Sequence, residues 1–316
     1  MNWKNLKNSN TLISIFIDNI EEHATALEET LYSVSKQTVA PDLLVLTKNL
    51  SDESKKTLEE LLNKPKIIIR TKEKNEESGE EKMVEIEQET DGKINYIIVD
   101  SDAKNFAQVY NQGFNLAIEG DYEWFMQIER EDIVALHWTE NLNKYSAGEE
   151  EVSLFFPLIR NSDNGVFAGL MNEAVWVDGM VDEAGKMDAQ LLMKYNCMFL
   201  LGAAIRPKSI LEYVEEVDGK YKPLKESFRV SHYYEFLLRL AYNGINSFAI
   251  PRLGYELRTF VKPNFNPTST KIPRNLSQLP AENGGIEQEE ATFWVEEAKK
   301  QYFYKEDEHI RFTKNG

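Results

Sequence analysis

The sequence is poor in the residues that form covalent crosslinks and transition-metal sites. Its 316 residues include one cysteine, Cys197, and four widely spaced histidines. A single cysteine excludes a disulfide within the chain, and no Cys/His spacing typical of a zinc site is present. Cys197 lies in an apolar stretch, where a buried and unreactive thiol is expected. These features favour a reducing compartment, and we expect a cytoplasmic protein.

Basic residues are scarce relative to acidic ones. The chain has 36 Lys and Arg against 53 Asp and Glu, which gives a formal charge of −17. Nucleic acids and anionic membrane surfaces attract an excess of Lys and Arg, so neither is expected as a general partner. A nucleotide can still bind such a protein through a bridging metal ion. The 42% apolar content is ample for a packed core.

Long apolar runs are also missing. No stretch approaches the roughly 20 apolar residues of a membrane-spanning helix, and residues 1–8 lack the apolar core of a signal peptide. The sequence has no Gly-rich phosphate loop and no Gly-x-Ser-x-Gly motif of an acyl-transfer enzyme. The absence of long apolar runs leads us to expect a soluble protein with no membrane span.

Strand and helix patterns alternate through the first half, and this order predicts a parallel sheet with flanking helices. A Ser51 cap followed by acidic residues marks the start of one helix. Residues 73–91 carry nine acidic residues, and we expect an exposed hairpin or mobile loop there. The expected strands are 13–17, 43–46, 66–70, 96–99 and 122–128, and the other expected helices are 24–36 and 105–118.

The second half has a different character. Further strands are expected at 152–159 and 247–250, with an apolar block at 199–205 and a helix at 234–242. Residues 262–285 contain four prolines and many polar residues, which predicts a linker or an extended arm. An amphipathic helix is expected at 286–302.

The strand at 122–128 runs into three carboxylates, Glu129, Glu131 and Asp132. Open α/β sheets bind ligands at the C-terminal ends of their strands. Carboxylate oxygens are suitable ligands for Mn²⁺ or Mg²⁺, so Glu129 and Glu131 are the predicted metal ligands. The alternative is a solvated strand end in which Arg130 pairs with one of these acids.

Several motifs occur in an order that resembles one enzyme family, the family 2 glycosyltransferases. The resemblance covers roughly residues 11–260 and implies the GT-A fold, a Rossmann-like α/β fold with a mixed, mostly parallel sheet flanked by helices. It implies a nucleotide-sugar-binding half at 11–135, an acceptor half at 136–260 and a C-terminal helical and extended arm at 261–316. The matching motifs are LEETLYSVSKQT at 27–38, Asn-Gln-Gly at 111–113, Gly-Ala-Ala at 202–204 followed by Arg206 near the acceptor side, and Tyr234 to Leu240 followed by Gly244 and Pro251.

The resemblance implies transfer of a sugar from a nucleotide-diphosphate donor, such as a UDP-sugar, to a hydroxyl of a glycan or protein acceptor. In such a reaction a metal ion offsets charge on the leaving diphosphate, and a base deprotonates the acceptor. Glu129 and Glu131 stand where the family has its Asp-x-Asp metal motif. The base position corresponds to His232, and Glu235 is the nearest carboxylate. The alternative for His232 is a helix cap or a core residue.

Other positions depart from the family pattern. The Asp-Asp pair after the second strand corresponds to Thr47 and Lys48, where Lys48 is suited to a diphosphate instead. Asp18 and Asn19 follow the first strand and are predicted to contact the base or ribose. A literal Asp-x-Asp at 100–102 precedes the helix that the family motif follows, so we expect Ser101 or Asp102 to cap that helix.

These departures support a second hypothesis of a different class. A GT-A-like domain that has lost transfer chemistry would serve as a binding or structural component of a larger assembly with other protein subunits. The two hypotheses differ over Lys48: a lysine that pairs with Glu129 or Glu131 would fill the donor site.

Overall fold

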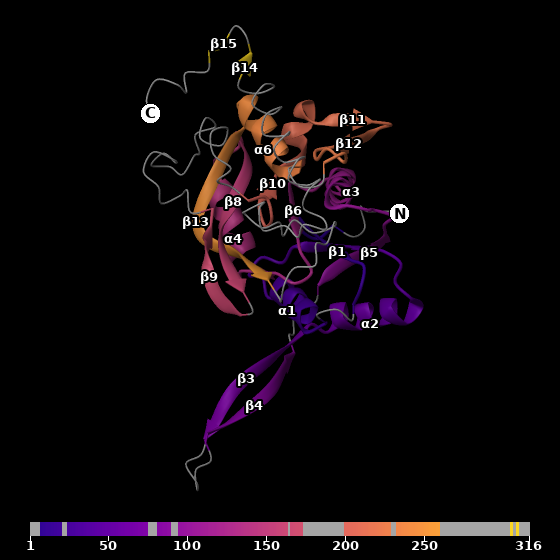
Figure 1. The fold of residues 1–316 in the computed structure, drawn as a ribbon, viewed down its shortest axis with the longest axis vertical. Helices are drawn as coiled ribbons and strands as arrows, with labels where there is room; N and C mark the ends of the chain where they lie inside the picture. The colour runs from indigo at the N-terminus through magenta and orange to yellow at the C-terminus, as the bar shows by residue number, and fades with distance from the viewer. Residues whose placement is uncertain are drawn as a thin grey trace, which may run out of the picture.

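A computed structural model describes most of the chain and shows a mixed sheet flanked by helices (Figure 1). Cys197, the proline-rich segment 262–285 and the helix expected at 286–302 lie outside the described residues. Near the C-terminus, β14 (Tyr304–Lys305) and β15 (Glu308–His309) form a short antiparallel pair. The described residues are 7–20, 24–74, 81–89, 94–163, 165–172, 199–228, 232–259, 304–305 and 308–309.

Four parallel strands form the N-terminal half of the sheet in the order β5-β2-β1-β6. They are β1 (Thr11–Ile17), β2 (Asp42–Thr47), β5 (Asn95–Asp100) and β6 (Trp124–Ile128). Every residue of β1, β2 and β6 is buried, because helices cover parallel strands on both faces. This explains their nearly continuous apolar sequences and confirms the parallel arrangement expected from the alternation.

Three helices connect these strands. Figure 1 shows α3 (Phe106–Glu119) on one side of them and α1 (Ala24–Ser35) and α2 (Asp52–Asn63) on the other. The predicted Ser51 cap is confirmed, since its hydroxyl accepts the N–H of Ser54 at 3.1 Å. The predicted cap of α3 is wrong. Asn105 caps this helix by accepting the N–H of Gln108 at 3.0 Å, whereas the Ser101 hydroxyl donates to the Gln112 side chain.

The strand expected at 66–70 does not join the parallel sheet. It belongs to β3 (Lys66–Lys74), which pairs only with β4 (Glu81–Glu89) in a two-stranded ribbon that projects from the body (Figure 1). The register of the ribbon places basic residues opposite acidic ones, including Lys66 with Glu89 and Lys74 with Glu81. The acidic run thus lies largely in the second strand of a hairpin, as one of the two expectations had it, and β5 is the strand that pairs with β2 in the main sheet.

The second half extends the same sheet in the order β6-β10-β8-β13-β7, with β9 paired to β8. Six strands (β5, β2, β1, β6, β8 and β13) point one way and three (β10, β7 and β9) point the other. The mixed, mostly parallel sheet is therefore confirmed. The strand bounds are β7 (Ile133–Val134), β8 (Val152–Asp163), β9 (Val166–Met171), β10 (Ala204–Ile205) and β13 (Asn246–Thr259).

Smaller elements complete the second half. Helix α4 (Trp138–Ser146) packs on β8 and β13, and the 3₁₀ helix η3 (Pro207–Tyr213) contacts both α3 and α6 (His232–Tyr242). Strands β11 (Glu215–Val217) and β12 (Lys220–Lys222) form a hairpin beside α3. The sequence pattern predicted α6 but not α4, whose nine residues are too few for a clear period.

Gly113 allows α3 to approach the sheet closely. A Cβ atom at this position would lie 2.9 Å from the Ser14 hydroxyl and 3.0 Å from the Phe125 ring. The expectation that glycine permits close packing here is confirmed, because these distances are shorter than van der Waals contact. The helix is thereby seated on β1 and β6, the two strands that border the candidate site.

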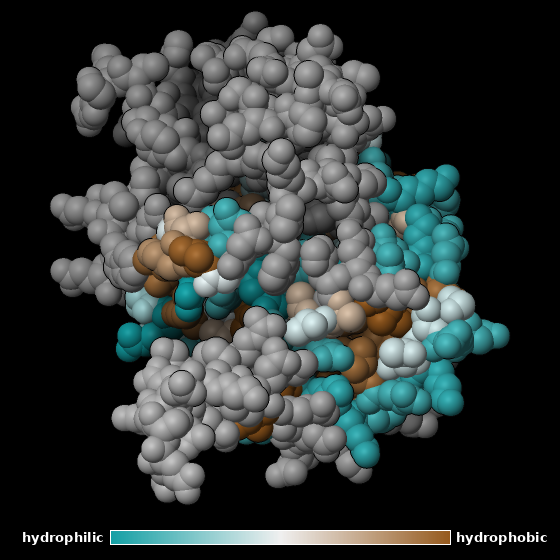
Figure 2. Space-filling model, turned by 60° about the horizontal axis from the view of Figure 1, so that its bottom comes forward, coloured by the Kyte–Doolittle hydropathy of each residue, from teal (hydrophilic) through white to brown (hydrophobic). Residues whose placement is uncertain are grey.

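Most of the described surface in Figure 2 is hydrophilic, and apolar residues lie between the hydrophilic ones. This agrees with the large excess of acidic residues. Among the described residues, the helices are too short or too polar to cross a membrane.

Candidate functional site

The sheet has a topological switch point between β1 and β6. The chain steps outward from β1 to β2 to β5, and then returns to β6 on the other side of β1. In open α/β sheets the crevice outside the carboxyl ends of two such strands is the usual ligand site. Asp18 and Asn19 follow β1 at this edge, and residues 129–132 follow β6. Both segments were predicted from the sequence.

Arg130 connects the segment after β1 with the segment after β6. Its Nη1 atom donates to Asp18 Oδ1 at 3.0 Å and to the Asn19 carbonyl at 2.7 Å. Its Nε atom lies 3.8 Å from Glu131 Oε1. The Thr30 hydroxyl of α1 donates to the Arg130 carbonyl at 3.0 Å, and the residue is only 8% exposed. The guanidinium is thus fixed by contacts on both its backbone and its side chain.

Asp132 anchors the loop that carries Glu129 and Glu131. Its carboxylate is fully buried and accepts the Tyr255 hydroxyl at 2.7 Å and the backbone N–H of Arg258 at 2.9 Å. The same hydroxyl accepts the N–H of Glu129 at 3.1 Å. Asp132 is therefore a structural residue, and β13 positions the loop.

Arg258 also ties this loop to α1. Its guanidinium donates to the Glu131 carbonyl, the Glu29 carboxylate and the Ala26 carbonyl. Tyr255 and Arg258 could not be assigned to the site from the sequence, because they lie more than 120 positions after the loop. Nothing in the sequence around Tyr255 and Arg258 indicates that these residues contact the loop at 129–132.

The two predicted metal ligands flank Arg130 in sequence. Glu129 and Glu131 are both partly buried, and Glu131 is held near the guanidinium. In the described part of the chain, no three His, Cys, Asp or Glu side chains form a group that could hold a metal ion. The Arg130 guanidinium thus lies between the two predicted ligands in sequence and beside Glu131 in space.

Lys48 lies at the carboxyl end of β2, next to the switch point. Its Nζ atom donates to the Ala103 carbonyl at 2.6 Å in the loop after β5. Lys48 is thus directed toward the β5 side and is not paired with Glu129 or Glu131. Beside it, Lys55 and Thr47 bind the Asp100 carboxylate at 2.9 and 3.1 Å and lower its pKa. The literal Asp-x-Asp thus begins with a residue bound to β2 and α2.

The two base candidates begin α6 and are deeply buried. His232 is 1% exposed and its ring stacks on Phe106 with centroids 5.2 Å apart. Glu235 is fully buried and forms a two-point ion pair with Arg239 at 2.9 and 3.0 Å, with Lys225 Nζ at 3.2 Å. Both candidates lie on one helix, and Glu235 is occupied by two cations.

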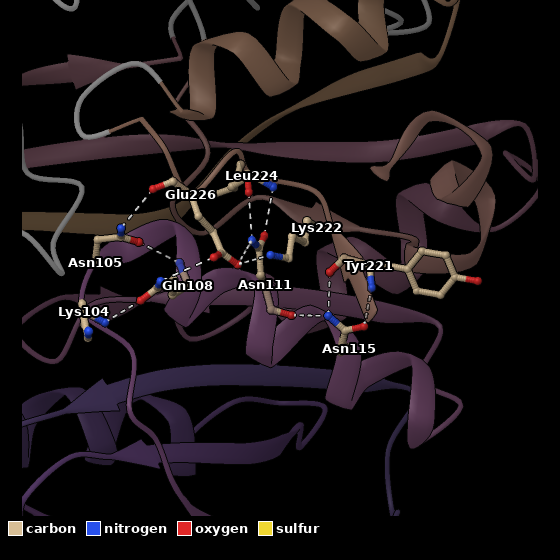
Figure 3. A network of polar contacts seen from close by, with 9 residues as sticks. All are labelled: Lys104, Asn105, Gln108, Asn111, Asn115, Tyr221, Lys222, Leu224 and Glu226. Atoms are coloured by element: carbon tan, nitrogen blue, oxygen red, sulfur yellow. Dashed lines mark hydrogen bonds and ion pairs between the residues drawn. The ribbon is translucent and has the colours of Figure 1, made fainter. Parts of the chain in front are cut away.

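The predicted Asn-Gln-Gly motif belongs to a polar network on α3 (Figure 3). Asn111 donates to the Leu224 carbonyl at 2.8 Å and accepts its N–H at 2.9 Å. Asn115, one turn later, makes the same pair of bonds with Tyr221 at 2.7 and 2.8 Å. The side-chain amides of Asn111 and Asn115 thus hold the backbone of residues 221–224 against the helix. Lys225, which follows, reaches Glu235 from this docked segment.

The Gly-Ala-Ala segment runs beside β6, where Gly202 bonds to Gln127 and Ala204 is paired with Met126. Gly202 has φ +70 and donates its N–H to the Gln127 carbonyl at 3.2 Å, and a Cβ there would lie 2.7 Å from the Tyr255 ring. Glycine is required because of this conformation and this contact. Arg206 lies instead at the amino end of β6, where it stacks on Trp124.

Buried tyrosines predict loss of stability at high pH. Burial raises the pKa of Tyr110, Tyr122 and Tyr255, and the carboxylates of Asp42 and Asp132 add to this for the last two. Above pH about 10 the unfolded chain releases these protons while the folded protein keeps them, so stability present below that pH is lost as pH rises.

For three such groups the free energy of unfolding should fall by up to about 4 kcal/mol per pH unit. Urea titrations between pH 8 and 11 would measure this slope. The variant Tyr110→Phe should reduce it by about a third, since one of the three protons is then absent. An unchanged slope in the variant would contradict the assignment.

The chain is similar to solved structures that include those of one S. aureus protein. No family model matches, and no curated protein matches. The S. aureus TarS 1–349 structure in complex with UDP-GlcNAc is similar with 11% identity and a TM-score of 0.49, covering 83% of this chain and 61% of that one. The complex of the same protein with UDP gives 11% identity and a TM-score of 0.47, covering 79% and 60%. This chain therefore spans less than two thirds of the length of these similar chains.

Proposed function

We propose that this chain is a glycosyltransferase-like protein that binds a nucleotide-diphosphate sugar at the carboxyl ends of β1 and β6 and transfers the sugar to an acceptor hydroxyl. The observation that carries this proposal is the convergence of Asp18, Asn19, Arg130 and Glu131 at the switch point. The family motifs in the sequence support it independently, because they do not depend on the strand order.

The residues at this edge have chemistry suited to the donor. Asp18 and Asn19 supply acceptor oxygens for the hydroxyls of a ribose or the N–H groups of a base. Arg130 supplies positive charge for a diphosphate in an otherwise acidic chain, and Lys48 would add to it on release from the Ala103 carbonyl. A UDP-sugar is the donor class proposed here. The acceptor hydroxyl belongs to a glycan or a protein that approaches the half of the chain at 136–260.

The metal ion implied by the family fits poorly. Mn²⁺ or Mg²⁺ bound by Glu129 and Glu131 would lie beside the fixed Arg130 guanidinium, and like charges repel at such distances. No step of the reaction is therefore assigned to a metal ion. For the acceptor, His232 and Glu235 are the proposed base residues on α6.

A second candidate function follows from the state of Glu235. This carboxylate is fully buried and ion-paired to Arg239 and Lys225, which is the arrangement of a structural residue. It favours a domain that binds a nucleotide or nucleotide sugar without transfer chemistry, as a component of a larger assembly. Both candidates use the same donor site and differ only in whether sugar transfer occurs after binding.

Calorimetric titration of UDP, GDP and UDP-sugars into the purified protein tests the donor site. We expect binding of at least one of these ligands, weakened by about tenfold or more in Asp18→Ala. Glu59→Ala is the matched control, since this exposed carboxylate of α2 lies away from the switch point. Absence of binding by the folded protein would overturn both candidates. Binding without sugar transfer or donor hydrolysis would favour the second.

A further inference from the structure

We infer that Arg130 is a built-in cation that takes the place of a divalent metal ion, so that this site binds a diphosphate without metal. The inference rests on the proposed function for the identity of the ligand. The oxygens around Arg130 form a cation site that the guanidinium already fills.

The oxygens around Arg130 are of the kind that Mg²⁺ and Mn²⁺ prefer. They are the carboxylate of Asp18, the backbone carbonyl of Asn19 and, at longer range, the carboxylate of Glu131. Two separate segments of the chain supply them, one after β1 and one after β6. Hard cations bind carboxylate and carbonyl oxygens of this type. The guanidinium thus supplies one positive charge beside two carboxylates, where a bound ion would otherwise supply it.

Arg130 is fixed in this position by the fold. Its carbonyl accepts the Thr30 hydroxyl, and the next turn is closed by the N–H of Asp132, which donates to the Glu129 carbonyl at 3.2 Å. Asp132 is in turn held by Tyr255 and the backbone of Arg258. A side chain mounted on such an anchored turn is preorganised, and a metal ion entering the same oxygens would have to displace it.

Removing the guanidinium should therefore uncover a metal site. In Arg130→Met the side chain keeps its apolar stem, while Asp18 and Glu131 lose their cation. We expect this variant to bind Mn²⁺ roughly tenfold or more tightly than the wild type, because the repulsion from a fixed positive charge is gone. Arg130→Lys is the matched control, since it keeps the charge and should show no gain.

The experiment is titration of Mn²⁺ alone, followed by calorimetry and by the loss of the free-ion EPR signal. The triple variant Arg130→Met/Asp18→Asn/Glu131→Gln should return to the wild-type affinity. A gain in Arg130→Met that the triple variant loses supports the inference. Equal affinities in folded wild type and Arg130→Met overturn it, as does a gain that survives in the triple variant.

Two further arms use the wild-type protein. If Arg130→Met fails to fold, Mn²⁺ binding is compared between the wild type and Glu129→Gln/Glu131→Gln. Wild-type Mn²⁺ binding that the double variant abolishes would overturn the inference. Weak wild-type binding that the double variant leaves unchanged supports it. Where UDP binds, EDTA should change its affinity by no more than about twofold. Failure of UDP to bind would count against the proposed function only, because the Mn²⁺ titrations contain no nucleotide.

Discussion

Asp132→Ala should lower the free energy of unfolding by about 3–5 kcal/mol, because it removes a buried charge that holds two other buried groups. The substitution leaves the Tyr255 hydroxyl and the Arg258 N–H without their 2.7 and 2.9 Å acceptor. It also frees the turn that carries Glu129 and Arg130. Urea denaturation followed by circular dichroism would measure the loss.

Two variants separate the parts of this effect. Tyr255→Phe keeps the ring under Gly202 and removes only the hydroxyl, so it should cost about 1–3 kcal/mol. Asp102→Ala is the control, since this exposed carboxylate lies in the loop after β5 and should change stability by less than about 0.5 kcal/mol. A loss below about 1 kcal/mol in Asp132→Ala would show that the buried carboxylate does not anchor the turn.

The N-terminal half of the fold could be predicted from the sequence because its signals are local. Buried parallel strands have continuous apolar sequences, and the faces of α1 and α2 repeat with the helical period. Chain order alone did not separate β3 from the parallel strands, because β3 is also rich in β-branched residues. Its partner is β4, which follows in the chain, and this pairing is known only from the register of the structure.

Only part of the candidate site could be predicted from the sequence. The rule that ligands bind at strand ends selected the acids after β6, and the family resemblance selected Asp18 and Asn19. The structure brings Asp18, Asn19 and Glu131 around Arg130. The anchoring residues were missed because β13 was expected to end at residue 250. In the structure β13 continues to Thr259 through register shifts around Leu253, which break the alternation that identifies a strand.

Arg130 shows why a motif does not fix a site's chemistry. In sequence it is the variable residue of an acid-x-acid pattern, and one alternative was that it pairs with a neighbouring acid. In the structure its shortest contacts are with Asp18 and Asn19, more than 100 positions earlier. Because β1 and β6 are adjacent in the sheet, the Arg130 side chain reaches from the end of β6 to the segment after β1. The strand order thus decides which cation the acids face.

Glu235→Ala should lower the free energy of unfolding by about 3–5 kcal/mol, because it leaves Arg239 and Lys225 without their shared buried carboxylate. Arg239 also donates to the Tyr213 and Pro223 carbonyls at 2.6 Å, so the ion pair links α6 to two neighbouring segments. Urea denaturation at neutral pH would measure this loss. A loss below about 1 kcal/mol would contradict a structural role for the pair.

The matched pair Glu235→Gln and Arg239→Met distinguishes that structural role from catalysis. Both variants break the same ion pair, but only Glu235→Gln removes the carboxylate that could accept an acceptor proton. If Glu235 is structural, any sugar transfer should fall in parallel with stability in both variants. If Glu235 is the base, Glu235→Gln should abolish transfer while nucleotide binding and Arg239→Met transfer persist. Because the proposed donor site lies at the end of β6 and Glu235 lies on α6, binding and transfer can be lost separately, and this pair of variants separates the two losses.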